Sequence, residues 1–213
     1  DLNAKIVFMA NTGSNTRSAI FPQLDDREIK SLLERMPPIE AARLLDDMSD
    51  RRLKRTLEIL EPKKAAQIRE LYKHDRHSAG RLMTNEFFAF HMNTTIGEVA
   101  ETIRDQPGID LTRRIFVLNE SDELVGFVPG RNLIINPPFV PLRQVMRPIL
   151  HQIHADTSRD EVVDLVERYK IPALPVVDDD DHLIGVITYE RVVEAMEDIA
   201  DETIASIAGT AHA

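Results

Sequence analysis

The sequence contains one short apolar motif twice, as Leu124-Val125-Gly126-Phe127-Val128 and as Leu183-Ile184-Gly185-Val186-Ile187. A second apolar run precedes each copy, Ile115-Phe116-Val117-Leu118 in the first and Leu174-Pro175-Val176-Val177 in the second. Short apolar runs joined by polar turns predict pairs of buried strands. We therefore expect the same small sheet to be built twice.

Helical segments surround both predicted strand pairs. The pattern predicts a helix over 98–103 before the first pair and another over 160–169 before the second. After the strands it predicts a weak helix from Gly130 and a clear one from Tyr189 through about Ile199. A duplicated module of this size is expected to pair with its own copy, which leaves a crevice where a ligand could bind.

A different repeat occupies residues 24–77. Apolar residues recur there every twelve positions, with the i, i+3, i+4, i+7 spacing of one helix face. Asp25 with Glu28 forms a capping-box signal, Ser49 suits an N-cap, and Pro38 and Pro62 suit first-turn positions. We expect four short helices that stack over their apolar faces, because one such helix alone is marginally stable. Residues 1–23 are interpreted as a leader.

Composition sets limits on the class of protein. The 213 residues are 43% hydrophobic and 29% charged, as in ordinary globular proteins, and no run approaches the ~20 apolar residues of a membrane helix. The lack of cysteine excludes disulfides and thiolate metal sites. The net charge of −10 argues against nucleic acid as a partner and leaves cations as candidates. No nucleotide-loop, hydrolase or metalloprotease motif is present, so we do not expect an enzyme.

Three segments carry a family resemblance. Ser78-Ala79-Gly80-Arg81-Leu82-Met83-Thr84 resembles the SAGGLMT segment of MgtE-type magnesium transporters, although Arg81 replaces a glycine. Leu174 to Asp178 and Leu183 to Thr188 resemble the LPVVD and LVGIVT segments of the same family. The order of parts is similar to a helical N domain followed by a CBS-domain pair.

The resemblance implies an α+β fold in two parts. These are an N-terminal helical superhelix at 24–77 and a tandem CBS pair, with one domain at 78–140 and the other, with a C-terminal connecting helix, at 141–213. It also implies the magnesium-sensing cytosolic region of a transporter at the cytoplasmic face of the cell membrane. Its partners would be a second copy of the chain, through the CBS domains, and the parent's membrane domain. Magnesium between the N domain and the CBS pair would close the region and gate ion transport.

An acidic face on the last helix is the strongest local signal for a metal. Glu190, Glu194, Glu197 and Asp201 are spaced by four, three and four residues, so they share one side of a helix. Like charges at this spacing destabilise a helix, and magnesium, which binds few carboxylates and keeps several waters, would relieve them. The alternative is a solvated helix face. The resemblance favours regulatory magnesium, with candidate ligands Glu194, Glu197, Asp198, Asp201, Glu202, Asp178, Asp47 and Asp50, and Asp46 beside the last two.

A nucleotide site is the competing interpretation. CBS pairs that bind adenosine nucleotides tend to follow the second strand with a hydroxyl for phosphate and an acid for ribose. The first copy has Pro129 and Asn132 at these positions, and the second has Thr188 and Arg191. Arg131 and Arg191 could contact phosphates. The alternative function is therefore a stand-alone CBS-pair protein that binds an adenine nucleotide, through Thr188, Arg191, Arg131 and Asn132, and regulates a soluble partner.

Overall fold

The computed structural model describes residues 23–108 and 114–211, so the predicted leader at 1–23 lies almost wholly outside the described residues. The chain divides into two compact units. The helical unit combines the chain up to His77 with Val193–Ala213, and the α/β unit is Ser78–Val192. Within the described residues, no helix is both long enough and apolar enough to cross a bilayer.

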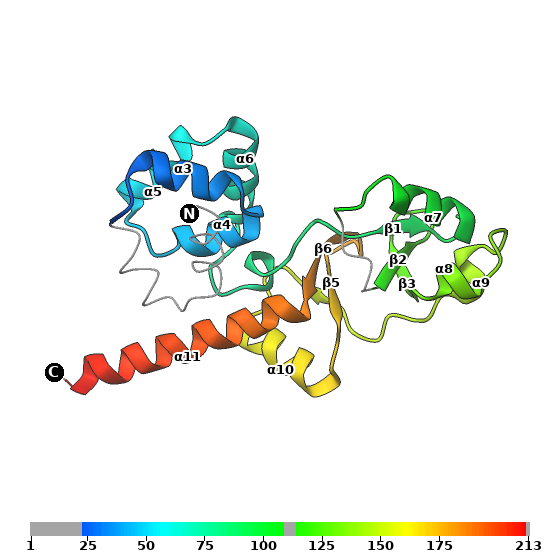
Figure 1. The fold of residues 1–213 in the computed structure, drawn as a ribbon. Helices are drawn as coiled ribbons and strands as arrows, with labels where there is room; N and C mark the ends of the chain where they lie inside the picture. The colour runs from blue at the N-terminus through cyan, green and yellow to red at the C-terminus, as the bar shows by residue number, and fades with distance from the viewer. Residues whose placement is uncertain (1–22, 109–113, 212–213) are drawn as a thin grey trace. The chain divides into compact units, whose positions relative to one another are not determined.

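Short helices joined by tight turns make up the first part of the helical unit (Figure 1). They are α3 (Asp26–Glu34), α4 (Pro38–Leu45), α5 (Asp50–Ile59) and α6 (Pro62–Leu71). Asp25 and Ser49 cap α3 and α5, because their side-chain oxygens accept hydrogen bonds from the backbone of Glu28 at 2.8 Å and Arg52 at 3.3 Å. Pro38 and Pro62 open α4 and α6, where a missing N–H costs no hydrogen bond.

The apolar faces of these helices enclose one core. Its largest fully buried side chains come from three helices and are Ile29, Leu32, Leu33, Leu44, Leu45 and Ile68. Arg43 and Thr56 are the polar side chains buried beside this core among the described residues of the four helices. Thr56 donates its hydroxyl to the carbonyl of Arg52 at 2.8 Å, within its own helix. Arg43 instead donates hydrogen bonds to Asp198, which lies outside these four helices.

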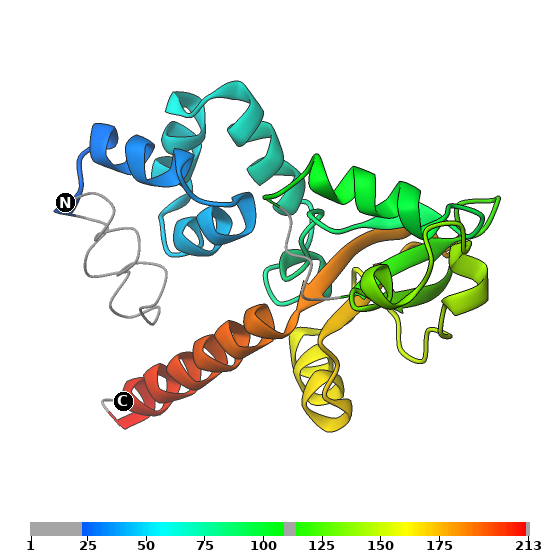
Figure 2. The same cartoon turned by 45° about the vertical axis from the view of Figure 1, so that its right-hand side comes forward.

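The α/β unit contains the same three-stranded sheet twice. Figure 2 draws the first copy mainly in green and the second mainly in yellow and orange. In each sheet the middle strand pairs in parallel with the first strand and antiparallel with the third. The elements of the first copy are η2 (Ala79–Arg81), β1 (Ala89–His91), α7 (Ile96–Arg104), β2 (Arg114–Leu118), β3 (Leu124–Pro129) and α8 (Asn132–Ile135). Those of the second are α9 (Leu142–Val145), β4 (Ile153–His154), α10 (Arg159–Tyr169), β5 (Ala173–Val177) and β6 (Leu183–Thr188).

The two copies exchange equivalent contacts inside the α/β unit. Thr84, at the start of the first copy, pairs through both of its backbone groups with Val186 of β6 at 2.8 and 2.9 Å. Arg147, at the start of the second copy, pairs in the same way with Phe127 of β3 at 2.8 and 3.0 Å. Each copy therefore extends the sheet of the other, and the duplication seen in the sequence folds as one body.

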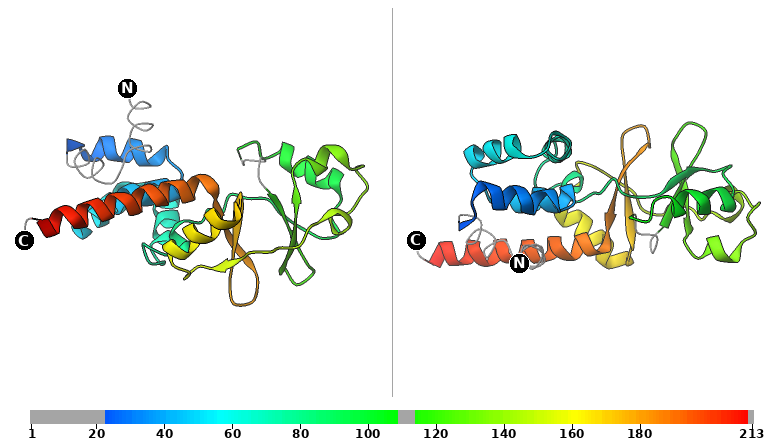
Figure 3. Two further views of the ribbon diagram at one scale, coloured as in Figure 1. Left: turned by 90° about the horizontal axis from the view of Figure 1, so that it is seen from below. Right: turned by 45° about the horizontal axis from the view of Figure 1, so that its top comes forward.

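The last helix, α11 (Tyr189–Ala211), follows β6 without a break and is continuous in both views of Figure 3. It is longer than the sequence pattern predicted, because it continues beyond Ile199 to Ala211. The hydroxyl of Thr203 donates to the carbonyl of Ile199 at 2.9 Å, so this polar residue turns back onto the helix instead of ending it. The added turns belong to the helical unit.

Candidate functional site

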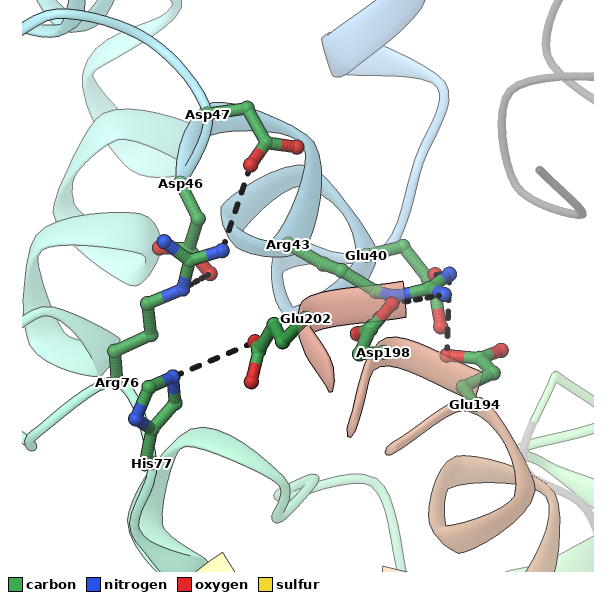
Figure 4. Close-up of polar contacts among 9 residues, drawn as sticks. All are labelled: Glu40, Arg43, Asp46, Asp47, Arg76, His77, Glu194, Asp198 and Glu202. Atoms are coloured by element: carbon green, nitrogen blue, oxygen red, sulfur yellow. Dashed lines mark hydrogen bonds and ion pairs between the residues drawn. The ribbon is translucent and has the colours of Figure 1, made fainter. Parts of the chain in front are cut away.

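A buried arginine lies at the centre of the candidate site (Figure 4). Arg43 of α4 donates from Nε and Nη2 to the two carboxylate oxygens of Asp198 in α11, each at 3.0 Å. Its Nη1 also lies 3.7 Å from Glu194 of α11 and 3.9 Å from Glu40 of α4. The Arg43 side chain is 3% exposed and that of Asp198 is 13% exposed. Two helices distant in the sequence are therefore joined by a forked, nearly dry ion pair.

A second set of charges surrounds Arg76 and His77, which follow α6 in the chain. Arg76 places Nη2 3.4 Å from Asp47 and Nε 3.8 Å from Asp46, both at the C-terminal end of α4. The neighbouring His77 places Nε2 3.6 Å from Glu202 of α11. Figure 4 shows these residues together with the Arg43 group on the face between α4 and α11, and we call all nine the α4–α11 charge cluster.

Acids outnumber bases in this cluster. Six of its nine residues are carboxylates, and they are matched by two arginines and one histidine. The imbalance is not limited to these residues, since Asp201 is half-buried on α11 and Glu197 is exposed on the same helix. Hard divalent cations prefer carboxylate oxygens, and this face presents more carboxylates than basic side chains within the cluster.

The structure brings together only part of the predicted ligand set. Glu194, Asp198, Glu202 and Asp47 belong to the cluster, and Asp46 joins them. Other predicted ligands, Glu197, Asp201 and Asp50, belong to the same unit. The sequence analysis missed Arg43 and Arg76, the cations already paired with several of these acids. Its one local signal was Arg43 flanked by Ala42 and Leu44, a charge inside an apolar stretch.

Asp178 belongs to the α/β unit, in the turn between β5 and β6. One of its oxygens accepts backbone hydrogen bonds from Asp180 and His182, both at 2.9 Å, and the other lies 3.3 Å from His182 Nδ1. These bonds, that from His182 foremost, lower the pKa of Asp178. Burial, the largest single effect, opposes the charge of His182, but the attraction and hydrogen bond of Asp178, with smaller contributions from Ser121 and Asp180, together raise the pKa of the imidazole. Asp178, Asp180 and His182 could present ligand atoms to one ion.

The candidate nucleotide residues have structural contacts. The Thr188 hydroxyl accepts a hydrogen bond from the backbone of Arg191 at 3.2 Å, so it caps the first turn of α11. Asn132 donates its amide to the side chain of Asn136 at 2.8 Å along α8. Arg131 is exposed immediately before that short helix. Both hydrogen bonds join residues three or four positions apart in the sequence, so they stabilise helix ends.

Comparison with known proteins identifies both parts of the chain. Residues 5–77 match the model of the MgtE intracellular N domain, and residues 79–136 and 142–198 each match the CBS domain. The magnesium transporter MgtE of Thermus thermophilus is 31% identical over 140 residues, which are 65% of this chain and 31% of the transporter. The magnesium transporter MgtE of Bacillus subtilis is 26% identical over 199 residues, 93% of this chain and 42% of the transporter. The chain thus spans less than half the length of these relatives.

Solved structures agree with this assignment. The crystal structure of the cytosolic domain of the Mg²⁺ channel MgtE in complex with ATP matches with a TM-score of 0.79 and 25% identity, over 89% of this chain and 78% of that one. The soluble part of a magnesium transporter matches with a TM-score of 0.69 and 20% identity, over 94% of this chain and all of that one, which supports the fold. The expected fold class, a helical N domain followed by a CBS pair, is confirmed. The chain belongs to the MgtE family and carries the MgtE intracellular N domain followed by two CBS domains.

Proposed function

We propose that this chain is the magnesium-sensing regulatory region of an MgtE-type magnesium transporter, positioned at the cytoplasmic face of the cell membrane. Its role would be to regulate ion transport by a membrane domain of the parent protein, without catalysis of its own. The family assignment supports this proposal, since the curated relatives are named magnesium transporters. The structural relative with 25% identity is described as the cytosolic domain of a Mg²⁺ channel.

The surplus of carboxylates in the α4–α11 charge cluster is the observation that carries the proposal. Glu194 and Glu202 of α11 belong to the same cluster as Asp46 and Asp47 of the N domain, and Arg43 and Arg76 do not balance the total charge. A magnesium ion with most of its water shell could bridge carboxylates from the two sides of this face. An intracellular sensor would need only weak sites, filled at about 1 mM free magnesium, the weak end of hard-cation binding.

The mechanism is a population shift. Magnesium that binds better when the N domain is attached to α11 favours the attached state, and only this difference in affinity can move the equilibrium. The helix α11 follows β6 of the second CBS domain directly in the chain. Attachment of the N domain to α11 would therefore couple the N domain to the CBS pair. Loss of magnesium leaves the like charges uncompensated and favours detachment.

A homodimer through the CBS domains belongs to the same proposal. The first CBS domain carries large apolar side chains at its surface, with Ile134 90% exposed and Phe139 79% exposed. Exposed apolar groups of this size are typical of surfaces that another protein covers. A second copy of the chain is the partner that the family resemblance suggests.

Small-angle scattering and limited proteolysis test the magnesium proposal directly. The 213-residue chain is measured in EDTA, in magnesium chloride, and in sodium chloride of equal ionic strength. We expect magnesium, but not sodium, to reduce the radius of gyration of the chain and to slow its proteolytic cleavage. The same size and the same cleavage rate in all three solutions would reject magnesium sensing by this chain.

Adenine-nucleotide binding by the CBS pair is a second candidate, favoured by one observation. The structural relative at 25% identity was solved in complex with ATP. Thr188 and Arg191 of the second CBS domain are the residues we propose for the phosphates, with Arg131 and Asn132 as their counterparts in the first. Calorimetry with AMP, ADP and ATP measures this binding. Tight nucleotide binding in a chain indifferent to magnesium would favour the stand-alone regulatory protein.

A further inference from the structure

Arg43 is the most completely enclosed charge in the helical unit among the residues described. Its side chain is 3% exposed, and the Nε–Nη2 edge of the guanidinium donates two hydrogen bonds to Asp198. Burial disfavours the charge, but the hydrogen bond and attraction of Asp198, followed by the attraction of Glu194 and Glu40, raise the pKa of Arg43. Arg43 is therefore a permanent cation at every pH in which the protein is folded.

Removal of one partner from such a pair is costly. A buried pair is only modestly favourable overall, because both ions lose water, but a single buried ion left behind is strongly unfavourable. Without Arg43, the carboxylates of Asp198, Glu194 and Glu40 would lose the cation that lies among them. The loss of this cation would favour detachment of the N domain from α11.

We propose that Arg43 is a positioning residue, a built-in cation that holds the N domain on α11 without any metal. Magnesium then strengthens an attachment that Arg43 already supports. The first half of this inference stands on the contacts of Arg43 alone. The second half rests on the proposed magnesium-sensing function. The chain would thus retain a basal attached population at low magnesium, and Arg43 would set its size.

Distance measurement between two labels tests the inference. The chain contains no cysteine, so Lys30→Cys on α3 and Ser206→Cys on α11, both at exposed positions, give specific attachment points for spin labels. The distance distribution is measured in EDTA and in magnesium chloride for the parent and for Arg43→Met. Arg55→Met is the matched control, because it breaks an exposed pair with Asp26, in which the Arg55 side chain is 66% exposed.

We expect the parent and Arg55→Met to share one distribution in EDTA, with a clear component at the attached distance that magnesium makes dominant and narrow. Arg43→Met in EDTA should be broad, with the ratio of detached to attached molecules raised roughly a hundredfold, the scale for loss of one partner of a buried pair. Magnesium should restore the narrow distribution in Arg43→Met, which simple unfolding would not allow. Far-ultraviolet circular dichroism checks whether the helices of this variant remain intact.

Two further variants separate the forked pair from simple charge. Arg43→Lys keeps the charge but not the two parallel hydrogen bonds, so its detached fraction should be intermediate. Arg43→Met combined with Asp198→Asn should detach less than Arg43→Met alone, because the most buried of the carboxylates that lose Arg43 is then neutral. A parent-like distribution of Arg43→Met in EDTA, or a parent with no attached component there, overturns the inference. If Arg43→Met is broad with and without magnesium while its circular dichroism is unchanged, the attachment role stands and magnesium sensing fails.

Discussion

Two glycines at the residue scale show how closely the two CBS domains pack against each other. A Cβ on Gly185 would lie 2.5 Å from Met83 Sδ and 2.9 Å from Met83 Cβ, and one on Gly126 would lie 2.8 Å from the carbonyl oxygen of Arg147. The methionine and the arginine each come from the start of the other copy. Gly185→Ala and Gly126→Ala should therefore destabilise the protein by about 1–3 kcal/mol through overpacking. Gly209→Ala in α11 meets nothing within 4 Å and should stabilise the helix by about 0.5–1 kcal/mol. Urea denaturation followed by circular dichroism measures all three. Equal stability of Gly185→Ala and the parent would contradict this packing.

The Asp178–His182 contact gives a second prediction at the same scale. The carboxylate raises the pKa of His182, so the folded chain binds this proton more tightly than the unfolded chain. The stabilisation is therefore complete below the ordinary histidine pKa and is lost as the pH rises through the folded value. Asp178→Asn should lower the pKa of His182 in a nuclear magnetic resonance titration of the imidazole. Asp164→Asn, which removes a carboxylate from α10, should leave it unchanged. A His182 pKa that ignores Asp178→Asn would refute the attraction.

Helix caps determine the element boundaries, and this is why the sequence predicted the N domain well. Ser49→Ala should cost about 1 kcal/mol, because the amide of Arg52 loses the hydroxyl that caps α5. Ser206→Ala, an exposed position inside α11, should change stability by only a few tenths of a kcal/mol in the favourable direction. Thermal unfolding of the two variants provides the comparison, and an equal effect of both would show that the cap contributes nothing.

Other elements could not be predicted from local sequence patterns. Strands β1 and β4 contain three and two residues, too few for any alternation to be detected, and they exist because a neighbouring strand supplies the hydrogen bonds. The candidate site has the same limitation. The acids of α11 were visible from their spacing, but Arg43 is 155 residues from Asp198 in the sequence. Only the tertiary fold shows that a protein cation already lies among these carboxylates.

The net charge of −10 becomes informative at the scale of the whole molecule, because part of it is concentrated on one face of the helical unit. A ligand that binds only the folded, attached form raises stability by RT ln(1 + [L]/Kd). At about 10 mM magnesium, with a Kd of about 1 mM, the gain is about 1.4 kcal/mol. The parent chain should show this increase on thermal unfolding, and sodium chloride of equal ionic strength should not reproduce it.

Neutralisation of the surplus acids should abolish this gain without loss of the Arg43–Asp198 pair. The variant replaces Glu194, Glu197 and Glu202 by glutamine and Asp201 by asparagine, and it keeps Asp198 because Arg43 would otherwise be left buried with fewer partners. In EDTA the variant should be at least as stable as the parent, since repulsion on α11 is relieved. In magnesium its unfolding temperature should stay where it was in EDTA. A matched variant with Glu161→Gln and Asp164→Asn on α10 should respond as the parent does. If the four-residue variant retains the full magnesium response, the ion binds elsewhere, and the turn at Asp178, Asp180 and His182 becomes the place to test next.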